Sequence, residues 1–242
     1  MIEIYTEQLA GIEVLQAVPA GQKQSALPTV FFYHGFTSSK LVYSYFAVAL
    51  AQAGMRVVMP DAQDHGARFN GDENARLRQF WSILKTSIDE FPGLRQALAD
   101  RNLTEKGKLA VGGASMGGMT ALGIMARHPQ VRCVACLMGS GYFTTLARTL
   151  FPPQEQQLDE SLARLAEYDV SHQLERIGDR PLMLWHGEED DVVPAVESWR
   201  LQQALMQQGL DKHLTCLWEA GVKHRITPAA LDATARFFTQ HL

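Results

Sequence analysis

The sequence predicts an α/β protein with a mostly parallel eight-stranded sheet and helices on both faces of that sheet. Short apolar runs of strand length alternate along the chain with segments of helical periodicity, which is the pattern of a largely parallel sheet. The chain has 242 residues, enough for a single well-buried domain over residues 1–242. The expected strands are residues 2–6, 12–18, 29–33, 56–61, 109–111, 134–138, 181–185 and 214–218.

The first two strands differ in pattern from the others. Residues 2–6 and 12–18 alternate between apolar and polar side chains, which predicts an antiparallel hairpin at the edge of the sheet. Later strands such as residues 29–33 are continuous apolar runs, typical of strands buried on both faces. Helical patterns fall between the strands, and the expected helices are residues 42–53, 80–99, 116–127, 199–208 and 228–241.

Residues 142–173 interrupt the strand rhythm. Pro152 and Pro153 break this segment, and Leu158, Leu162 and Leu165 then recur at helical spacing. The segment is expected to be a small helical cap inserted over the C-terminal edge of the sheet, where such caps shape a pocket and exclude water. The alternative is a simple helical excursion that packs elsewhere.

The composition excludes several classes of function. The net charge is −4 and no basic run stands out, so nucleic acid is not an expected partner. The N-terminus lacks the basic and apolar regions of a signal peptide, and no apolar run approaches transmembrane length, so we expect a cytoplasmic protein with no membrane partner. The sequence offers no cluster of metal ligands, and neither a metal nor an organic cofactor is expected.

Three cysteines fit a reducing compartment. Cys133 and Cys136 have the C-x-x-C spacing of redox or metal motifs, but they lie inside an apolar run that predicts a strand. Residues three apart on a strand face opposite sides of the sheet, and no second pair completes a zinc site. We therefore interpret both cysteines as structural.

The chain is organised around Gly113-Ala114-Ser115-Met116-Gly117, a G-x-S-x-G pattern between a predicted strand and a predicted helix. At such a turn the serine sits on strained backbone with its hydroxyl outward, and glycines on either side let strand and helix approach closely. The pattern alone is weak, and its strand–turn–helix context strengthens it. The alternative is a glycine-rich turn with an incidental serine.

A nucleophilic serine needs donors for the oxyanion that develops on the substrate. In this architecture one donor is the N–H of the residue after the nucleophile, here Met116, and the other comes from the loop after an earlier strand. The turn His34-Gly35-Phe36 follows the strand at residues 29–33, so the Phe36 N–H is the candidate second donor. The alternative is a plain loop with a buried aromatic.

A base and an acid for Ser115 follow in the expected chain order. In enzymes with this serine turn the order is serine, then an acidic residue, then histidine, each after a strand. His224 follows the last strand, and the other seven histidines lie elsewhere in the order. The acid lies among Glu188, Glu189, Asp190 and Asp191, between which position alone does not choose. A second polar cluster, formed by Asp61, Asp64 and His65, is expected to hold its own loop by hydrogen bonds instead.

These motifs together resemble a known superfamily. His186-Gly187-x-x-Asp190-x-x-Val193-Pro194 is similar to a segment of α/β-hydrolase esterases and prolyl-oligopeptidase-like hydrolases in which the fifth residue is the triad acid. The resemblance covers nearly the whole chain and is nearest to the small cytoplasmic carboxylesterases of enteric bacteria, in the branch that includes dienelactone hydrolases. It implies the α/β-hydrolase fold and Asp190, rather than Asp191, as the acid. Many relatives carry a small residue directly after the histidine, where this chain has Arg225. The larger side chain is expected to alter the rim of the pocket and removes no member of the triad.

The resemblance implies hydrolysis of short-acyl esters, so the predicted function is a serine carboxylesterase that acts on small-molecule esters through Ser115, Asp190 and His224, with Phe36 and Met116 as oxyanion donors. Alternatives within the fold are a thioesterase or a small peptidase, although peptidases of the prolyl oligopeptidase type usually carry a large extra domain. A non-catalytic binding protein of the same fold is a further alternative. The sequence leaves acyl-chain length and oligomeric state open.

Overall fold

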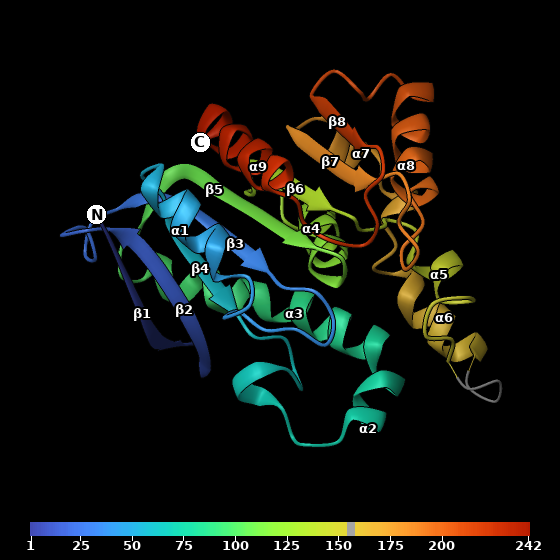
Figure 1. The fold of residues 1–242 in the computed structure, drawn as a ribbon, viewed down its shortest axis with the longest axis horizontal. Helices are drawn as coiled ribbons and strands as arrows, with labels where there is room; N and C mark the ends of the chain where they lie inside the picture. The colour runs from blue at the N-terminus through green and yellow to red at the C-terminus, as the bar shows by residue number, and fades with distance from the viewer. Residues whose placement is uncertain (154–157) are drawn as a thin grey trace.

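The computed structural model describes residues 1–153 and 158–242, whose strands form an eight-stranded sheet in the order β1-β2-β4-β3-β5-β6-β7-β8 (Figure 1). The strands are β1 (Ile2–Leu9), β2 (Ile12–Pro19), β3 (Leu27–Tyr33), β4 (Arg56–Pro60), β5 (Thr104–Ala114), β6 (Cys133–Leu137), β7 (Leu182–Gly187) and β8 (Leu214–Glu219). The strand pairs from β4 to β8 are parallel. The predicted α/β-hydrolase fold with a mostly parallel sheet is confirmed.

The N-terminal hairpin is antiparallel and forms one edge of the sheet, as predicted. Its register runs from Ile2 opposite Pro19 to Leu9 opposite Ile12. Strand β2 then pairs antiparallel with β4, which begins the parallel part of the sheet.

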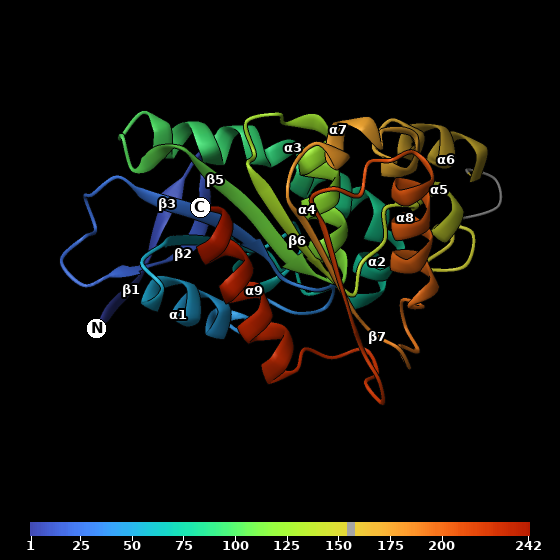
Figure 2. The same cartoon turned by 90° about the horizontal axis from the view of Figure 1, so that it is seen from above.

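Helices cover both faces of the sheet (Figure 2). On one face, α3 (Phe80–Ala99), α4 (Met116–Arg127) and α8 (Val196–Gln207) contribute side chains to one apolar cluster. On the other face, α1 (Ser44–Gln52) and α9 (Pro228–His241) contribute to a second cluster. Shorter helices and turns complete the chain: η1 (Gly66–Arg68), α2 (Glu73–Arg78), α5 (Phe143–Leu146), α6 (Leu158–Ala166), η3 (Val170–His172) and α7 (Glu175–Gly178).

Successive strand residues supply these two clusters alternately, because side chains on a strand point to opposite faces. Phe31 belongs to one cluster and Phe32 to the other. Cys133 and Cys136 likewise lie in different clusters and are buried, and burial raises the pKa of each thiol to about 12. The two cysteines thus face opposite sides of the sheet, as predicted.

Some boundaries differ from the sequence prediction. Strand β5 runs from Thr104 to Ala114, whereas only residues 109–111 were expected, because the polar start and the glycine-rich end of this strand both lack the apolar pattern. Helix α2 lies in a stretch where no helix was predicted. Its N-cap is Asp72, whose side chain accepts a hydrogen bond from the Ala75 N–H at 2.9 Å.

The segment predicted as a cap, residues 142–173, contains α5, α6 and η3, and its residues 154–157 lie outside the described residues. Helices α5 and α6 lie side by side (Figure 1). The buried Asp169 ties the two ends of the segment together, because its carboxylate accepts hydrogen bonds from the Thr144 N–H at 2.8 Å and the Ser171 N–H at 3.0 Å. In the described part of the chain, no helix combines the length and hydropathy needed to cross a membrane.

The first turn of α4 packs against the end of β3 without room for a side chain. A Cβ placed on Gly117 would overlap the carbonyl group of Tyr33, and one placed on Gly113 would overlap the carbonyl group of Gly117. Strand β5, helix α4 and strand β3 therefore meet through their backbones at this point.

This contact predicts that Gly117→Ala is strongly destabilising. Because the obstacle is backbone and not a flexible side chain, the free energy of unfolding is expected to fall by about 2–3 kcal/mol in urea denaturation. Gly93→Ala in α3 is the matched control, since its Cβ would meet only the Ala10 Cβ at 3.5 Å. The control is expected to be neutral or stabilising by up to about 1 kcal/mol, as alanine is the better helix former. Equal effects of the two substitutions would contradict this account.

Candidate active site

Ser115 occupies the tight turn between β5 and α4. Its backbone has φ 57° and ψ −120°, a conformation that costs a non-glycine residue about 1–3 kcal/mol. The turn is fixed by hydrogen bonds from the Ser115 N–H to the Leu137 carbonyl at 2.8 Å and from the Met119 N–H to the Ser115 carbonyl at 3.0 Å. The strain therefore persists because neighbouring strands and helix determine the turn.

His224 and Asp190 reach Ser115 from the far half of the sheet. Asp190 follows β7, and His224 lies between β8 and α9. The Nε2 atom of His224 is 2.9 Å from the Ser115 Oγ, and its Nδ1 atom is 2.7 Å from the Asp190 Oδ2. Three residues separated by up to 109 positions thus form one continuous hydrogen-bond chain.

The carboxylate of Asp190 is buried and well supplied with donors. Its Oδ1 accepts hydrogen bonds from the Val192 and Val193 N–H groups, each at 2.9 Å. Its Oδ2 lies 3.2 Å from the Nε2 of His186 in addition to its contact with His224. Burial acts to raise the pKa of Asp190, but the hydrogen bonds from His186, His224 and Val192 outweigh it and hold that pKa well below its usual range.

Asp191, the alternative acid, points elsewhere. Its side chain is exposed and lies 3.1 Å from the Lys223 ammonium group, whose hydrogen bond lowers the pKa of Asp191. The structure brings Asp190, and not Asp191, into contact with His224.

His186 supports the loop after β7 that carries Asp190, a contact that the sequence analysis missed. It is fully buried, its Nε2 is 2.8 Å from the Val193 carbonyl oxygen, and its Nδ1 is 2.8 Å from the Ser198 Oγ. Because a carbonyl oxygen only accepts, the Nε2 atom carries a proton and donates to the Val193 carbonyl. The signal in the sequence was the motif itself, which begins at His186.

The two candidate oxyanion donors lie on either side of the serine turn. Met116 begins α4, so its N–H is one of the unpaired donors at a helix N-terminus. Phe36 follows β3, in a loop that passes close to Ser115: a Cβ on Gly35 would be 3.5 Å from the Ser115 Cβ. Within residues 1–153 and 158–242, neither the Phe36 N–H nor the Met116 N–H has a protein acceptor.

Two buried histidines hold the Phe36 loop. The Nε2 of His34 accepts from the Ala62 N–H at 3.0 Å, and burial lowers the pKa of His34 to about 4, which keeps the ring neutral near pH 7. The Nε2 of His65 accepts from the Thr37 N–H at 3.0 Å, and burial lowers the pKa of His65 as well. Neutral rings are required because each Nε2 must accept a hydrogen bond.

The polar loop after β4 behaves as predicted. Asp61 accepts hydrogen bonds from the Lys40 N–H at 2.8 Å and the Ala67 N–H at 2.9 Å, and Asp64 accepts from the Asn70 N–H at 2.9 Å. These contacts hold the loops around the site in place. The described residues contain no group of three His, Cys, Asp or Glu side chains placed to hold a metal ion.

Comparison with known proteins decides the family. The family model of the prolyl oligopeptidase family matches residues 42–242. The chain belongs to the prolyl oligopeptidase family. Two relatives align with this chain over the full length of both sequences. It is 63% identical to the esterase YjfP of Escherichia coli K12 and 30% identical to the putative esterase YitV of Bacillus subtilis 168.

Solved structures show the same fold at low sequence identity. TT1662 of Thermus thermophilus superposes on this chain with a TM-score of 0.82 at 21% sequence identity. The alignment covers 99% of this chain and 98% of TT1662. A puromycin-hydrolysing peptidase of Mycobacterium tuberculosis gives a TM-score of 0.75 at 21% identity, covering 98% of this chain but 40% of its own. These likenesses establish the α/β-hydrolase architecture.

The lowered pKa of Asp190 predicts how Asp190→Asn changes stability with pH. The unfolded chain takes up a proton near the ordinary aspartate pKa of about 3.9, whereas the folded carboxylate resists protonation. The stability that Asp190 contributes is therefore present above about pH 4 and is lost as the pH falls below that value. We expect the difference in melting temperature between wild type and Asp190→Asn to shrink between pH 5 and pH 2.5.

Asp191→Asn is the matched control for this measurement, because Asp191 is exposed and its ion pair with Lys223 is screened by water. Its melting temperature is expected to follow wild type closely across the same range. A difference for Asp190→Asn that stays constant down to pH 2.5 would contradict the assignment of a low pKa to this carboxyl group.

Proposed function

We propose that the chain is a serine carboxylesterase that hydrolyses short-acyl esters through a triad of Ser115, His224 and Asp190. The observation that carries this proposal is the hydrogen-bond chain from the Ser115 Oγ through His224 to Asp190, with distances of 2.9 and 2.7 Å. At the coarser level the chain is a carboxylic ester hydrolase, in agreement with its 63% identity to an esterase over the full length of both chains.

The proposed reaction is a two-step acyl transfer. The Ser115 hydroxyl donates its hydrogen bond to the His224 Nε2, so His224 is placed to take this proton as Ser115 Oγ attacks the ester carbonyl carbon. His224 then gives the proton to the oxygen of the departing alcohol, which leaves an acyl group on Ser115. Water, deprotonated by His224, attacks this acyl group and releases the carboxylic acid.

Asp190 sets the tautomer of His224 in this scheme. The His224 Nδ1–H donates to the Asp190 Oδ2, which leaves Nε2 free to accept the serine proton. Because the pKa of Asp190 is well below its usual range, its carboxylate keeps its charge and stabilises the imidazolium that forms.

The Phe36 and Met116 N–H groups are the proposed oxyanion donors. Both lie beside Ser115 without protein acceptors among the described residues, so both can bind a developing negative charge. The reaction needs no metal or organic cofactor. A cytoplasmic location and a small-molecule ester as the natural substrate remain part of the proposal, and the helices of the 142–173 segment are its proposed cap.

Peptide or amide hydrolysis is a second candidate, since the fold also matches peptidases such as the one from Mycobacterium tuberculosis. That peptidase is much longer than the region aligned with this chain, which covers 40% of it. An aminoacyl p-nitroanilide belongs in the same assay panel as the esters, and faster turnover of the anilide would favour the peptidase.

Hydrolysis of p-nitrophenyl esters from acetate to decanoate tests the proposal directly. The wild-type protein is expected to hydrolyse the short esters, with kcat/KM falling steeply as the chain lengthens. Ser115→Ala is expected to lower kcat by at least about 10⁴-fold, because the nucleophile is absent. Undiminished hydrolysis by the Ser115→Ala protein would rule out Ser115 as the nucleophile.

The two neighbouring aspartates provide a second test. Asp190→Asn is expected to lower kcat by about 10⁴-fold, since an amide cannot stabilise the imidazolium and favours the wrong tautomer of His224. Asp191→Asn is the matched control and should retain kcat within about threefold, because Asp191 contacts Lys223 instead. Reversed effects would assign the acid to Asp191.

A further inference from the structure

Three phenylalanines from separate segments meet beside the Phe36 loop. The Phe36 ring packs edge-on against Phe80 at 4.9 Å and against Phe151 at 5.1 Å between ring centroids. Phe80 and Phe151 stack on each other at 4.7 Å. We call these residues the aromatic trio. It joins the oxyanion loop, the start of α3 and the 142–173 segment, so it connects the proposed cap to the catalytic site.

The order of the strands separates the Phe36 loop from the His224 segment. In the sheet, β3 with its Phe36 loop and β8 with the His224 segment stand on opposite sides of β5, which ends at Ser115. The leaving alcohol must lie near the His224 Nε2, since that atom protonates it. With the carbonyl oxygen held by the Phe36 and Met116 N–H groups, the acyl chain is directed to the other side, toward the aromatic trio.

Phe151 is held in this place against a backbone cost. Its φ is 48°, in the left-handed region that a bulky side chain rarely adopts. The Trp81 indole N–H donates to the carbonyl oxygens of Leu150 at 3.1 Å and of Phe151 at 3.2 Å, which pins this part of the chain to α3. Such strain persists where the surroundings enforce it, and it clusters at functional positions.

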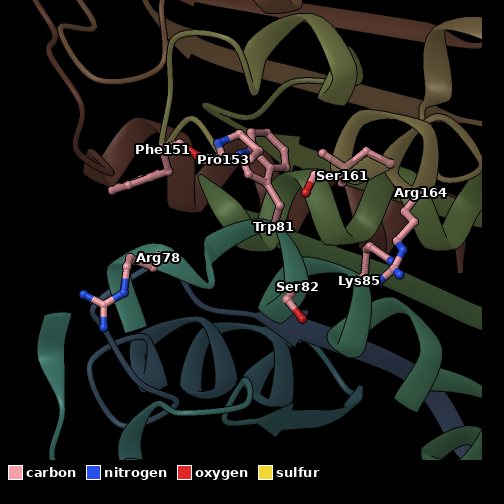
Figure 3. Close-up of a pocket in the computed structure, with 9 residues that line it drawn as sticks. Arg78, Trp81, Ser82, Lys85, Phe151, Pro153, Ser161 and Arg164 are labelled. Carbon is pink, nitrogen blue, oxygen red and sulfur yellow. Dashed lines mark hydrogen bonds between the residues drawn. The ribbon is translucent and has the colours of Figure 1, made fainter. Parts of the chain in front are cut away.

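A cleft of about 290 Å³ lies between α3 and α6, and Phe151 is one of the residues that line it (Figure 3). Trp81, Lys85, Phe151 and Leu165 are among the residues that line it, and Trp81 points from α3 toward the segment that carries Pro153 (Figure 3). None of Ser115, Asp190 and His224 lines this cleft. Phe151 therefore contacts Phe36, in the loop after β3, and also lines a cleft that no triad residue lines.

We propose that Phe151 is a specificity-determining residue: its ring closes the acyl side of the site and separates that side from the cleft between α3 and α6. The inference rests on the proposed esterase function and names the residue that sets its acyl-chain length. With the ring present, long acyl chains meet the aromatic trio. Without the ring, the acyl side opens into the cleft, whose lining includes the apolar side chains of Trp81 and Leu165 together with the charged side chains of Arg78, Lys85 and Arg164.

The test is the ratio of kcat/KM for p-nitrophenyl decanoate to that for p-nitrophenyl butyrate. Each methylene group that leaves water contributes a factor of about four to binding, so burying two further methylenes raises the ratio by more than about tenfold. Phe151→Ala and Phe151→Gly are both expected to raise the ratio by at least about tenfold. Phe151→Gly also removes the backbone strain, so it folds at least as readily as Phe151→Ala.

Leu150→Ala is the matched control. It removes an apolar side chain one position away, on the same pinned segment, but outside the aromatic trio. It should leave the decanoate-to-butyrate ratio at the wild-type value even if its melting temperature falls. Should the alanine and glycine variants fold poorly, Phe151→Leu provides a smaller ring-free side chain, for which we expect an intermediate ratio.

The outcomes separate this inference from the proposed function. An active wild-type enzyme whose decanoate-to-butyrate ratio is unchanged in all of the Phe151 variants overturns the role of Phe151 and leaves the esterase standing. A ratio that rises equally in Leu150→Ala also overturns it, since loosening of the segment would then be the cause. A wild-type protein that hydrolyses no ester overturns both proposals.

Discussion

The structure depends on one close contact, where β5, α4 and the end of β3 meet through backbone atoms at Gly113 and Gly117. Because neither glycine has a Cβ, the chain can turn from strand to helix within one residue, and Ser115 takes the strained conformation with φ 57° that this turn requires. The same contact sets the Met116 N–H at a helix start and brings the loop after β3 alongside the serine. Ser115, the proposed nucleophile, and its two proposed oxyanion donors are thus positioned by the same backbone contact.

The rest of the site depends on the parallel sheet. Since the C-terminal ends of parallel strands lie at one edge, the loops after β7 and β8 deliver Asp190 and His224 to the serine turn. Buried polar contacts fix the loops after β7 and β3: His186 and two backbone N–H groups hold Asp190, while His34 and His65 hold the loop that carries Phe36. In the proposed triad, His224 contacts both of the other members, and Asp190 is oriented by further hydrogen bonds from the Val192 and Val193 N–H groups.

Much of this could be predicted from the sequence, because the decisive features are local. The glycine-flanked serine, the order of acid and histidine, and the continuous apolar runs are all visible in short windows. The full length of β5 could not be predicted, since its pairing partners and not its own pattern extend it. The hydrogen bond from the Trp81 indole to the Phe151 carbonyl joins segments about 70 residues apart, so no local pattern predicts it or the positive φ of Phe151. His186 was visible as a motif residue, but its contact with Asp190 required the folded loop.

The central claim is that Ser115 is an activated nucleophile, and covalent labelling tests it most directly. The intact protein is treated with an alkyl fluorophosphonate, which reacts with activated serines, and the adduct is measured by mass spectrometry and located by peptide mapping. The account predicts one adduct per chain, on the peptide that contains Ser115, and slower labelling when His224 is replaced by alanine. An adduct on a different residue, or no adduct on a protein that hydrolyses esters, would contradict it.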